Sequence, residues 1–320
     1  MNECRICGNS TNNTELEIRE MYYNLKEKFR YFKCDNCGCL QISEYPENIA
    51  DYYPKIYSSF TKPVEKNNGW LLHSLRKSKL KYCLLDQFDI IGLLLSKIYK
   101  CGFERLLKYP KVKPNSKILD IGSGTGALIK RLINKGFENI TGTDIFIDED
   151  IIFDKRLRIL KKDINEINET FDFVMMNHCL EHMPHQLDVL TKISRLLNKD
   201  NFLMIRIPIV DKFSWREYGL NWIAIDPPRH YYLHTEKSIK ILADKSGFEL
   251  EHIAYDSTEF QFIGSEQILS NIPLRSENSY YENQKKSVFT KRDVKNYKKM
   301  ADKLNEQKDG DFGVFYLKKR

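Results

Sequence analysis

The feature that most constrains the fold is a glycine-rich turn between an apolar run and an amphipathic run. Residues 117–126 read KILDIGSGTG, and the helical pattern ALIKRLI follows at 127–133. Glycines let a ligand approach the backbone closely, and the first turn of a helix offers free N–H groups. The segment therefore predicts a strand, a ligand-binding turn and a helix of an α/β fold.

The glycine spacing alone leaves two classes of ligand open. Gly122, Gly124 and Ala127 also satisfy the dinucleotide fingerprint. Asp120 distinguishes the two, because a carboxylate two residues before the first glycine would be costly beside a pyrophosphate. The same carboxylate suits the sulfonium and ammonium groups of S-adenosylmethionine (SAM). The sequence therefore favours SAM.

Acidic residues also follow the next two apolar runs. Asp144 ends the run at 140–145, where a carboxylate can accept both hydroxyls of a ribose. Asp163 ends the run at 160–164, where it could accept from an adenine amino group or instead cap a helix. Both acids fit a ligand that contains adenosine.

With a further strand predicted at 171–178 and Leu-Glu-His at 180–182, the chain resembles class I SAM-dependent methyltransferases. The resemblance implies an α/β fold, a Rossmann-like sheet of seven strands with the last strand antiparallel. We expect this core at 111–320, with an insertion at about 257–310.

The resemblance also implies a SAM site. The turn would receive the carboxypropyl arm beside Asp120, Asp144 would bind the ribose, and Asp163 with Ile164 would bind the adenine. The expected SAM-binding residues are Asp120, Gly122, Ser123, Gly124, Thr125, Gly126, Asp144, Ile145, Asp163, Ile164 and Asn177.

Pro-Arg-His at 228–230, after Trp222 and before a helix that ends in Gly-Phe, resembles methyltransferases of polysaccharide and glycan biosynthesis. This resemblance implies a small-molecule or glycan acceptor, methylated on a sugar hydroxyl or amine. A general base would then remove the acceptor's proton. The candidates are His182 and His230, then His178, Glu181 and His234; alternatively, Glu181 and His182 pair at a helix start and Arg229 is a structural clamp.

The Leu-Glu-His segment is also similar to ubiquinone-pathway O-methyltransferases, in which acids and a histidine bind a divalent ion. His178, Glu181 and His182 would be the ligands, although His178 stands where that family has an acid.

Two CxxC pairs, each followed by glycine, predict a metal site near the N-terminus. Cys4, Cys7, Cys34 and Cys37 can supply the four thiolates of a structural Zn²⁺ site, which would stabilise a module at 1–44 too small for its own core. Cys39 could replace Cys37. The other cysteines, Cys83, Cys101 and Cys179, are expected to be reduced apolar fillers.

Residues 45–110 show helical spacing of apolar residues and predict a connector or cap; contact with a membrane surface is the alternative. The net charge of +7 allows, but does not favour, nucleic acid. The chain begins without a signal-peptide pattern and has no apolar run near about 18 residues, so we expect a cytoplasmic protein.

Two alternative functions remain: an RNA methyltransferase with the zinc module as a clamp, and a non-catalytic interaction protein. The sequence does not predict the oligomeric state.

Overall fold

The computed structural model describes residues 2–25, 27–53, 74–75, 78–79, 82–84, 89–98, 102–153 and 156–320. The chain divides into two compact units. The first unit comprises Met1–Tyr53, His178–Asp188 and Ile205–Phe315, and the second comprises Pro54–Asn177, Val189–Met204 and Tyr316–Arg320.

The second unit is built around parallel strands. Strand β4 (Ile118–Ile121) pairs in parallel with β5 (Ile140–Thr143) and with β8 (Phe171–Asn177), and β5 pairs in parallel with β7 (Leu157–Leu160). All residues of β4 and β5 are buried, as expected for apolar runs in a sheet covered on both faces. The α/β prediction is confirmed for this part of the chain.

The larger sheet has eight strands in the order β11-β12-β9-β8-β4-β5-β7-β6. It includes β9 (Leu197–Pro208), β11 (Phe248–Tyr255) and β12 (Phe312–Lys319). The prediction of seven strands is wrong by one, because the two-residue strand β6 (Ile151–Ile152) pairs antiparallel with β7. An edge strand offers unpaired N–H and C=O groups to a passing segment, which needs no hydrophobic pattern of its own.

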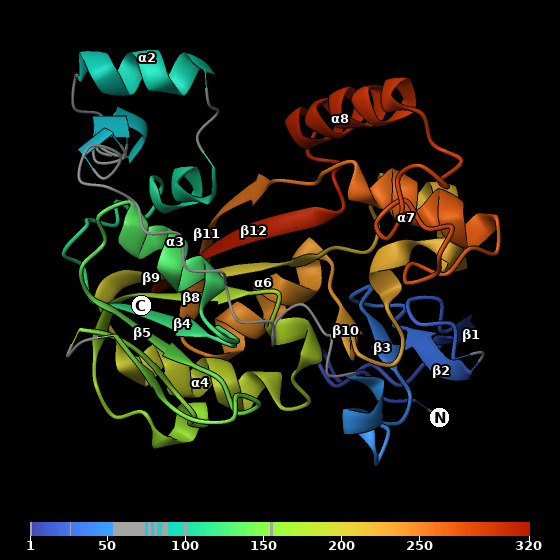
Figure 1. Ribbon diagram of the computed structural model, residues 1–320. Helices are drawn as coiled ribbons and strands as arrows, with labels where there is room; N and C mark the ends of the chain where they lie inside the picture. The colour runs from blue at the N-terminus through green and yellow to red at the C-terminus, as the bar shows by residue number, and fades with distance from the viewer. Residues whose placement is uncertain are drawn as a thin grey trace. The chain divides into compact units, whose positions relative to one another are not determined.

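Helices cover the parallel strands. Helix α3 (Ala127–Asn134) buries Leu128, Ile129 and Leu132 on one face, and α4 (Gln186–Leu196) follows the same amphipathic rule. Figure 1 shows α3 and α4 on opposite sides of β4 and β5.

The first unit contains a second, four-stranded sheet in the order β1-β2-β3-β10. Strands β1 (Thr14–Arg19), β2 (Lys28–Lys33) and β3 (Leu40–Ile42) form an antiparallel meander, in which β1 and β2 lie between the two CxxC pairs. Strand β10 (Tyr232–Leu233) pairs with β3. The cysteine-rich N-terminal segment therefore shares a sheet with residues far along the chain.

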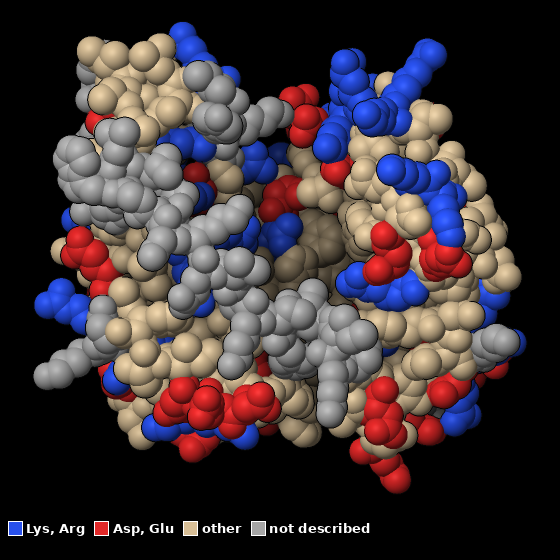
Figure 2. Space-filling view, in the orientation of Figure 1, with Lys and Arg blue, Asp and Glu red and all other residues tan. Residues whose placement is uncertain are grey.

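Four further helices belong to the first unit: α5 (Phe213–Tyr218), α6 (Glu236–Lys245), α7 (Phe260–Leu269) and α8 (Lys291–Glu306). Thr235 and Thr290 begin α6 and α8 with capping boxes. Helix α8 buries Val294, Ala301 and Leu304, and Figure 2 shows Lys and Arg side chains gathered over this helix.

Between the cysteine-rich segment and β4, the described residues include the 3-10 turns η1 (Ile49–Tyr52) and η3 (Phe103–Leu107) and helix α2 (Ile90–Ile98). The helical prediction for 45–110 is confirmed for α2, while most of residues 54–88 lie outside the described residues. In the part of the chain that the structure describes, no helix has both the length and the apolar character needed to cross a bilayer.

Candidate functional site

The strand register gathers the predicted SAM-binding acids at one edge of the sheet. Ile121, the last residue of β4, lies opposite Thr143 of β5 and Met176 of β8. Asp144 and Asn177 each come one residue after these partners, so both lie beside the turn that begins at Gly122. Parallel strands place their carboxyl ends together, which is where ligands bind in open α/β sheets.

The turn uses its glycines for conformations that other residues avoid. Gly122, Gly124 and Gly126 have φ values of 72°, 54° and 82°. A Cβ atom on Gly126 would come within 2.2 Å of Cδ1 of Ile159, on β7. The turn thereby brings its backbone N–H groups and the start of α3 to the strand edge.

Asp144 holds the turn in place. Its Oδ2 accepts a hydrogen bond from the Gly124 amide at 2.8 Å, and its Oδ1 accepts from the Phe146 amide at 2.8 Å. Each oxygen keeps a second lone pair for another donor. The side chain of the next residue, Ile145, is 51% exposed, so an apolar surface lies beside the carboxylate.

Asp120 lies in a different environment. It is 2% exposed, and burial followed by the nearby Asp144 carboxylate raises the pKa of Asp120 to about 8. Because burial disfavours the charged carboxylate, such an acid either holds a proton or is neutralised by a nearby cation. The hydroxyl of Ser123, in the turn itself, is buried without a hydrogen-bond partner among the described residues. Both features fit a cationic ligand that also offers polar atoms.

The side chain of the third predicted acid, Asp163, forms a hydrogen bond within its own segment. Asp163 caps the turn η4 (Ile164–Glu166), accepting from the Asn165 amide at 2.9 Å, so the helix-cap alternative is confirmed. Ile164 is buried at 4% exposure. Their expected contact with adenine stays a prediction.

The histidine candidates lie in the first unit, where they form a cluster with Glu181. One ligand atom of each of Glu181, His182 and His230 lies within 4.8 Å of the others. The His182 and His230 rings have centroids 4.7 Å apart and meet edge to face. His178 Nδ1 lies 3.6 Å from Oε1 of Glu181, and its φ of 53° is unusual for a residue other than glycine.

Backbone carbonyls orient both histidine rings. Nδ1 of His182 lies 2.9 Å from the Arg229 carbonyl and 3.0 Å from the Tyr53 hydroxyl, and Nδ1 of His230 lies 2.8 Å from the Ala224 carbonyl. A carbonyl only accepts, so each Nδ1 carries a hydrogen, which makes Nε2 the nitrogen that has the lone pair in the neutral form of either ring. Burial, with a smaller effect of His230, lowers the pKa of His182 to about 4.

Comparison with known proteins identifies the part of the chain around the glycine turn. Residues 96–253 match the family described as "Methyltransferase domain". This segment is a SAM-dependent methyltransferase domain. The Ubiquinone/menaquinone biosynthesis C-methyltransferase UbiE of Coxiella burnetii (strain RSA 331 / Henzerling II) is 22% identical over 162 residues, which are 45% of this chain and 62% of that protein. The match therefore spans less than two thirds of the relative's length.

Solved structures similar to this chain include the cyclopropane synthase MmaA2 from Mycobacterium tuberculosis, at 17% identity and a TM-score of 0.42. That alignment covers 79% of this chain and 99% of the other. A SAM-dependent methyltransferase from Archaeoglobus fulgidus has 18% identity and a TM-score of 0.41, covering 71% and 99% of the two chains.

Arg229, within the methyltransferase domain, is a structural clamp, as the alternative interpretation predicts. Its guanidinium is fully buried and donates to Asp226 and, at 2.9 Å, to Glu20. It also lies over the rings of Tyr22 and Tyr23, 5.0 and 5.1 Å from their centroids. The clamp joins the end of β1 to the loop that carries His230. Sequence reasoning missed Glu20, because nothing in the local pattern pairs residues 209 positions apart.

His234 does not belong to the cluster. It is fully buried, and its ring nitrogens lie 2.9 Å from the Ser238 hydroxyl and the Gln186 side-chain oxygen. With both nitrogens engaged in the core of the methyltransferase domain, His234 has a structural role.

The four predicted cysteines form a compact cluster ahead of the domain. Sγ of Cys4 lies 3.5 Å from Sγ of Cys37, Sγ of Cys7 lies 3.5 Å from Sγ of Cys34, and all four sulfurs lie within 4.8 Å of one another. Tetrahedral Zn²⁺ with bonds of about 2.3 Å requires sulfurs about 3.8 Å apart. The Gln41 side chain donates to Cys4 Sγ at 2.9 Å, as expected beside a thiolate. The residues fit the ion.

The remaining described cysteines do not belong to the sulfur cluster. Cys39 is buried 3.9 Å from His234 and is not in the sulfur cluster, so Cys37 is the fourth member. Cys179 is buried and forms no disulfide, as predicted. Cys83 is disulfide-bonded, so its prediction as a reduced filler is wrong; helical periodicity carries no information about a covalent partner. Cys101 lies outside the described residues.

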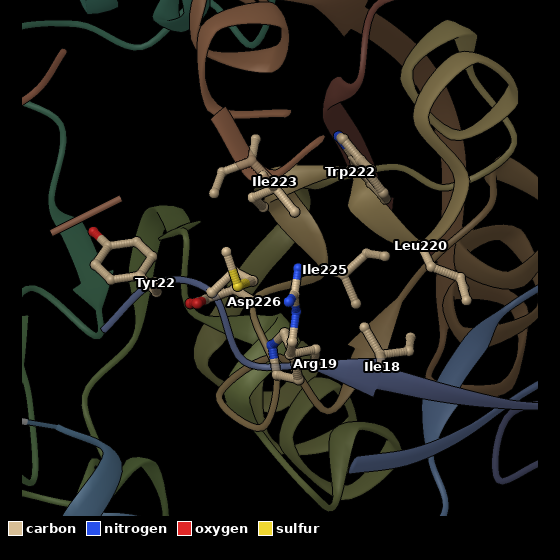
Figure 3. A pocket seen from close by; sticks show the side chains of 11 residues that line it. Ile18, Arg19, Tyr22, Leu220, Trp222, Ile223, Ile225 and Asp226 are labelled. Carbon is tan, nitrogen blue, oxygen red and sulfur yellow. The ribbon is translucent and has the colours of Figure 1, made fainter. Parts of the chain in front are cut away.

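A shallow apolar pocket lies between β1 and the 220–227 segment (Figure 3). Ile18, Leu220, Trp222 and Ile223 contribute to its wall. The Trp222 indole is anchored at 2.9 Å to Asp311. The pocket adjoins the Arg229 clamp through Asp226, and none of the clustered histidines lines it.

Proposed function

We propose that this chain transfers a methyl group from SAM to a hydroxyl or amine of a sugar or glycan precursor. The observation that carries the proposal is the buried Asp120 carboxylate beside a turn of three glycines with positive φ. A sulfonium and an ammonium group would neutralise this carboxylate, whereas a pyrophosphate would repel it.

The proposed pose of SAM assigns one part of the ligand to each feature. The carboxypropyl arm lies on the turn 122–126, with its ammonium group beside Asp120. Asp144 accepts from the ribose hydroxyls through the lone pairs that its backbone contacts leave free, and Ile145 packs against the adenine. Asp163 and Ile164 complete the adenine end, and Asn177 lies where β8 ends.

Methyl transfer is an in-line displacement. A lone pair of the acceptor oxygen or nitrogen attacks the methyl carbon as the carbon–sulfur bond breaks, and its electrons stay on sulfur. The acceptor's proton must leave as well. We assign this task to the cluster of His182 and His230, where an Nε2 lone pair can accept it.

The glycan acceptor is proposed from the Pro-Arg-His resemblance. Support comes from the burial of Arg229, which fixes the loop that carries His230.

For the N-terminal cluster we propose structural Zn²⁺ bound by Cys4, Cys7, Cys34 and Cys37. The distances between the sulfur atoms support this proposal.

Incubation with SAM and a panel of nucleotide-activated sugars, read by mass spectrometry, tests the proposal. We expect a product 14 mass units heavier, a shift set by replacing one hydrogen with a methyl group. Asp120→Asn should abolish turnover, whereas Asp188→Asn, an exposed acid on α4, should leave it unchanged. Turnover on RNA alone would reject the acceptor, and NAD binding without SAM binding would reject the enzyme class.

A further inference from the structure

We propose that the outer face of helix α8 is a surface that binds membranes containing anionic lipids. Four side chains, which we call the cationic stripe, carry the proposal: Arg292, Lys295, Lys299 and Lys303. The helix lies outside residues 96–253, which match the methyltransferase domain, so the family match assigns it no role.

The spacing of the stripe places its four residues on one line along the helix. They follow one another at intervals of three, four and four residues, and residues at these intervals share a helix face. The rise of a helix per residue makes the stripe about 17 Å long. All four residues are exposed, and the residues that α8 buries lie on the opposite face: Val294, Ala301 and Leu304.

Contacts along α8 fix which of its faces points outward. The Tyr297 ring stacks on Phe262 of α7, with ring centroids 5.0 Å apart. Near the end of the helix, the Asn305 side chain accepts from the Ser257 amide and donates to the Ser257 carbonyl, both at 2.9 Å. The stripe is therefore held on the outside of the first unit, where Figure 2 shows Lys and Arg side chains together.

The charges of the stripe are not neutralised by other described residues. None of its four side chains forms an ion pair in the part of the chain that the structure describes, whereas Lys298, beside them, lies 3.5 Å from Glu259. The acids of α8 lie off the stripe. Asp293 accepts from Thr290 in the capping box, Asp302 lies on one flank, and Glu306 is the last residue of the helix.

Like charges four residues apart on a helix repel each other. Lys295, Lys299 and Lys303 form two such pairs in succession, which destabilises the helix. Helix α6 has the opposite arrangement, because Lys240 lies 2.7 Å from Asp244, four residues further on. An anionic surface placed over the stripe would offset the repulsion in α8.

The residues around the stripe favour lipid over nucleic acid. Met300, one turn before Lys303, is 43% exposed, and Val288, just ahead of the helix, is 67% exposed. Apolar side chains beside cations suit the boundary between headgroups and acyl chains. Single-stranded nucleic acid instead needs exposed rings on which bases stack, but Tyr297, the one aromatic residue of α8, is stacked on Phe262.

Sedimentation of the full chain with lipid vesicles tests the surface. We expect the chain to bind vesicles of equimolar phosphatidylcholine and phosphatidylglycerol, but not vesicles of phosphatidylcholine alone, and to be released as the ionic strength rises. A triple variant with Lys295→Gln, Lys299→Gln and Lys303→Gln should bind the anionic vesicles about fivefold more weakly for each lysine removed, or roughly a hundredfold in all.

The matched control is a triple variant with Lys111→Gln, Lys113→Gln and Lys199→Gln. It makes the same change in net charge at exposed positions outside the first unit, and it should bind the anionic vesicles nearly as the parent does. Glutamine is a good helix former, so both variants should keep the far-ultraviolet circular dichroism spectrum of the parent.

Three outcomes would overturn the proposal. The folded parent might bind neither kind of vesicle or both kinds equally, or the two triple variants might lose equal affinity. In the third outcome, the stripe variant loses binding to single-stranded poly(U) RNA but not to anionic vesicles, which would make the stripe a nucleic-acid surface. None of these measurements requires SAM, so the result is independent of the proposed function.

Discussion

At the scale of single residues, Asp120 and Asp144 lie beside the same glycine turn but in different environments. Asp144 accepts two backbone amides and holds the glycine turn, whereas Asp120 is buried and has a raised pKa. A cationic ligand favours the ionised form of Asp120, so ligand binding and proton release are coupled.

This coupling predicts a pH dependence of SAM affinity. The free Asp120 has a pKa of about 8, so below that pH it is protonated and must lose its proton when a cation binds. Between about pH 6 and 7.5 the affinity should therefore rise with pH, by at most about tenfold per unit. Calorimetry in buffers of different ionisation enthalpy would show the released proton. Asp120→Asn should bind weakly and with no such slope; an unchanged slope would assign the proton to another group.

The site residues that the sequence singled out are those whose local setting depends on neighbours in the chain, and their contacts with SAM stay predictions. Asp120 and Asp144 follow directly from strand–turn patterns. Glu20, Tyr53 and Asp226 were not singled out as partners, because they meet Arg229 or His182 only after the chain has folded. Local spacing carries no information on such contacts.

At the scale of elements, the turn between β4 and α3 combines a backbone and a packing requirement. Gly126 has φ of 82°, and its Cα faces the fully buried Ile159 of β7. A side chain there would strain the backbone and also collide with the sheet.

We predict that Gly126→Ala lowers the free energy of unfolding by about 1–3 kcal/mol, from strain and overpacking together. Gly219→Ala is the matched control, because Gly219 also has positive φ but has open space where a Cβ would lie. Urea denaturation measures both. Adding Ile159→Val, which removes the clashing methyl, should recover part of the loss; a strictly additive double mutant would show that the collision does not matter.

Elements with a strong apolar period were predictable, and those that depend on pairing were not. The β4–α3 segment and β8 follow from apolar runs, whereas β6 has two residues and forms only because β7 is next to it. Similarly, 198–201 reads as a turn, but β9 begins already at Leu197. Asn and Asp tolerate turns, and a partner strand can override that preference.

At the scale of the whole molecule, the segments that carry the cysteine cluster contact elements far along the chain. Strand β3 pairs with β10, and the Thr235 hydroxyl that caps α6 donates to the Cys37 carbonyl at 2.6 Å. Lys245, at the end of α6, donates to the Ile6 carbonyl at 2.7 Å. The ends of α6 therefore contact both CxxC segments.

Loss of the proposed Zn²⁺ should loosen this part of the first unit first. Cys4→Ser should reduce bound zinc and lower the free energy of unfolding by about 3 kcal/mol or more. Hydrogen exchange should accelerate at β10 and α6 and stay slow at β4 and β5. Cys179→Ser, which changes a buried thiol outside the cluster, is the control. Equal acceleration everywhere would mean that the cluster has no regional effect.

The pairing of β3 with β10 also has a consequence for synthesis. Gln41 leaves the ribosome about 190 residues before its partner Tyr232, a delay of roughly 10–40 s at typical elongation rates. During that interval the nascent β3 edge has no strand to pair with. Metal captured by the thiolates as soon as Cys37 emerges would keep this segment ordered until translation delivers its partner.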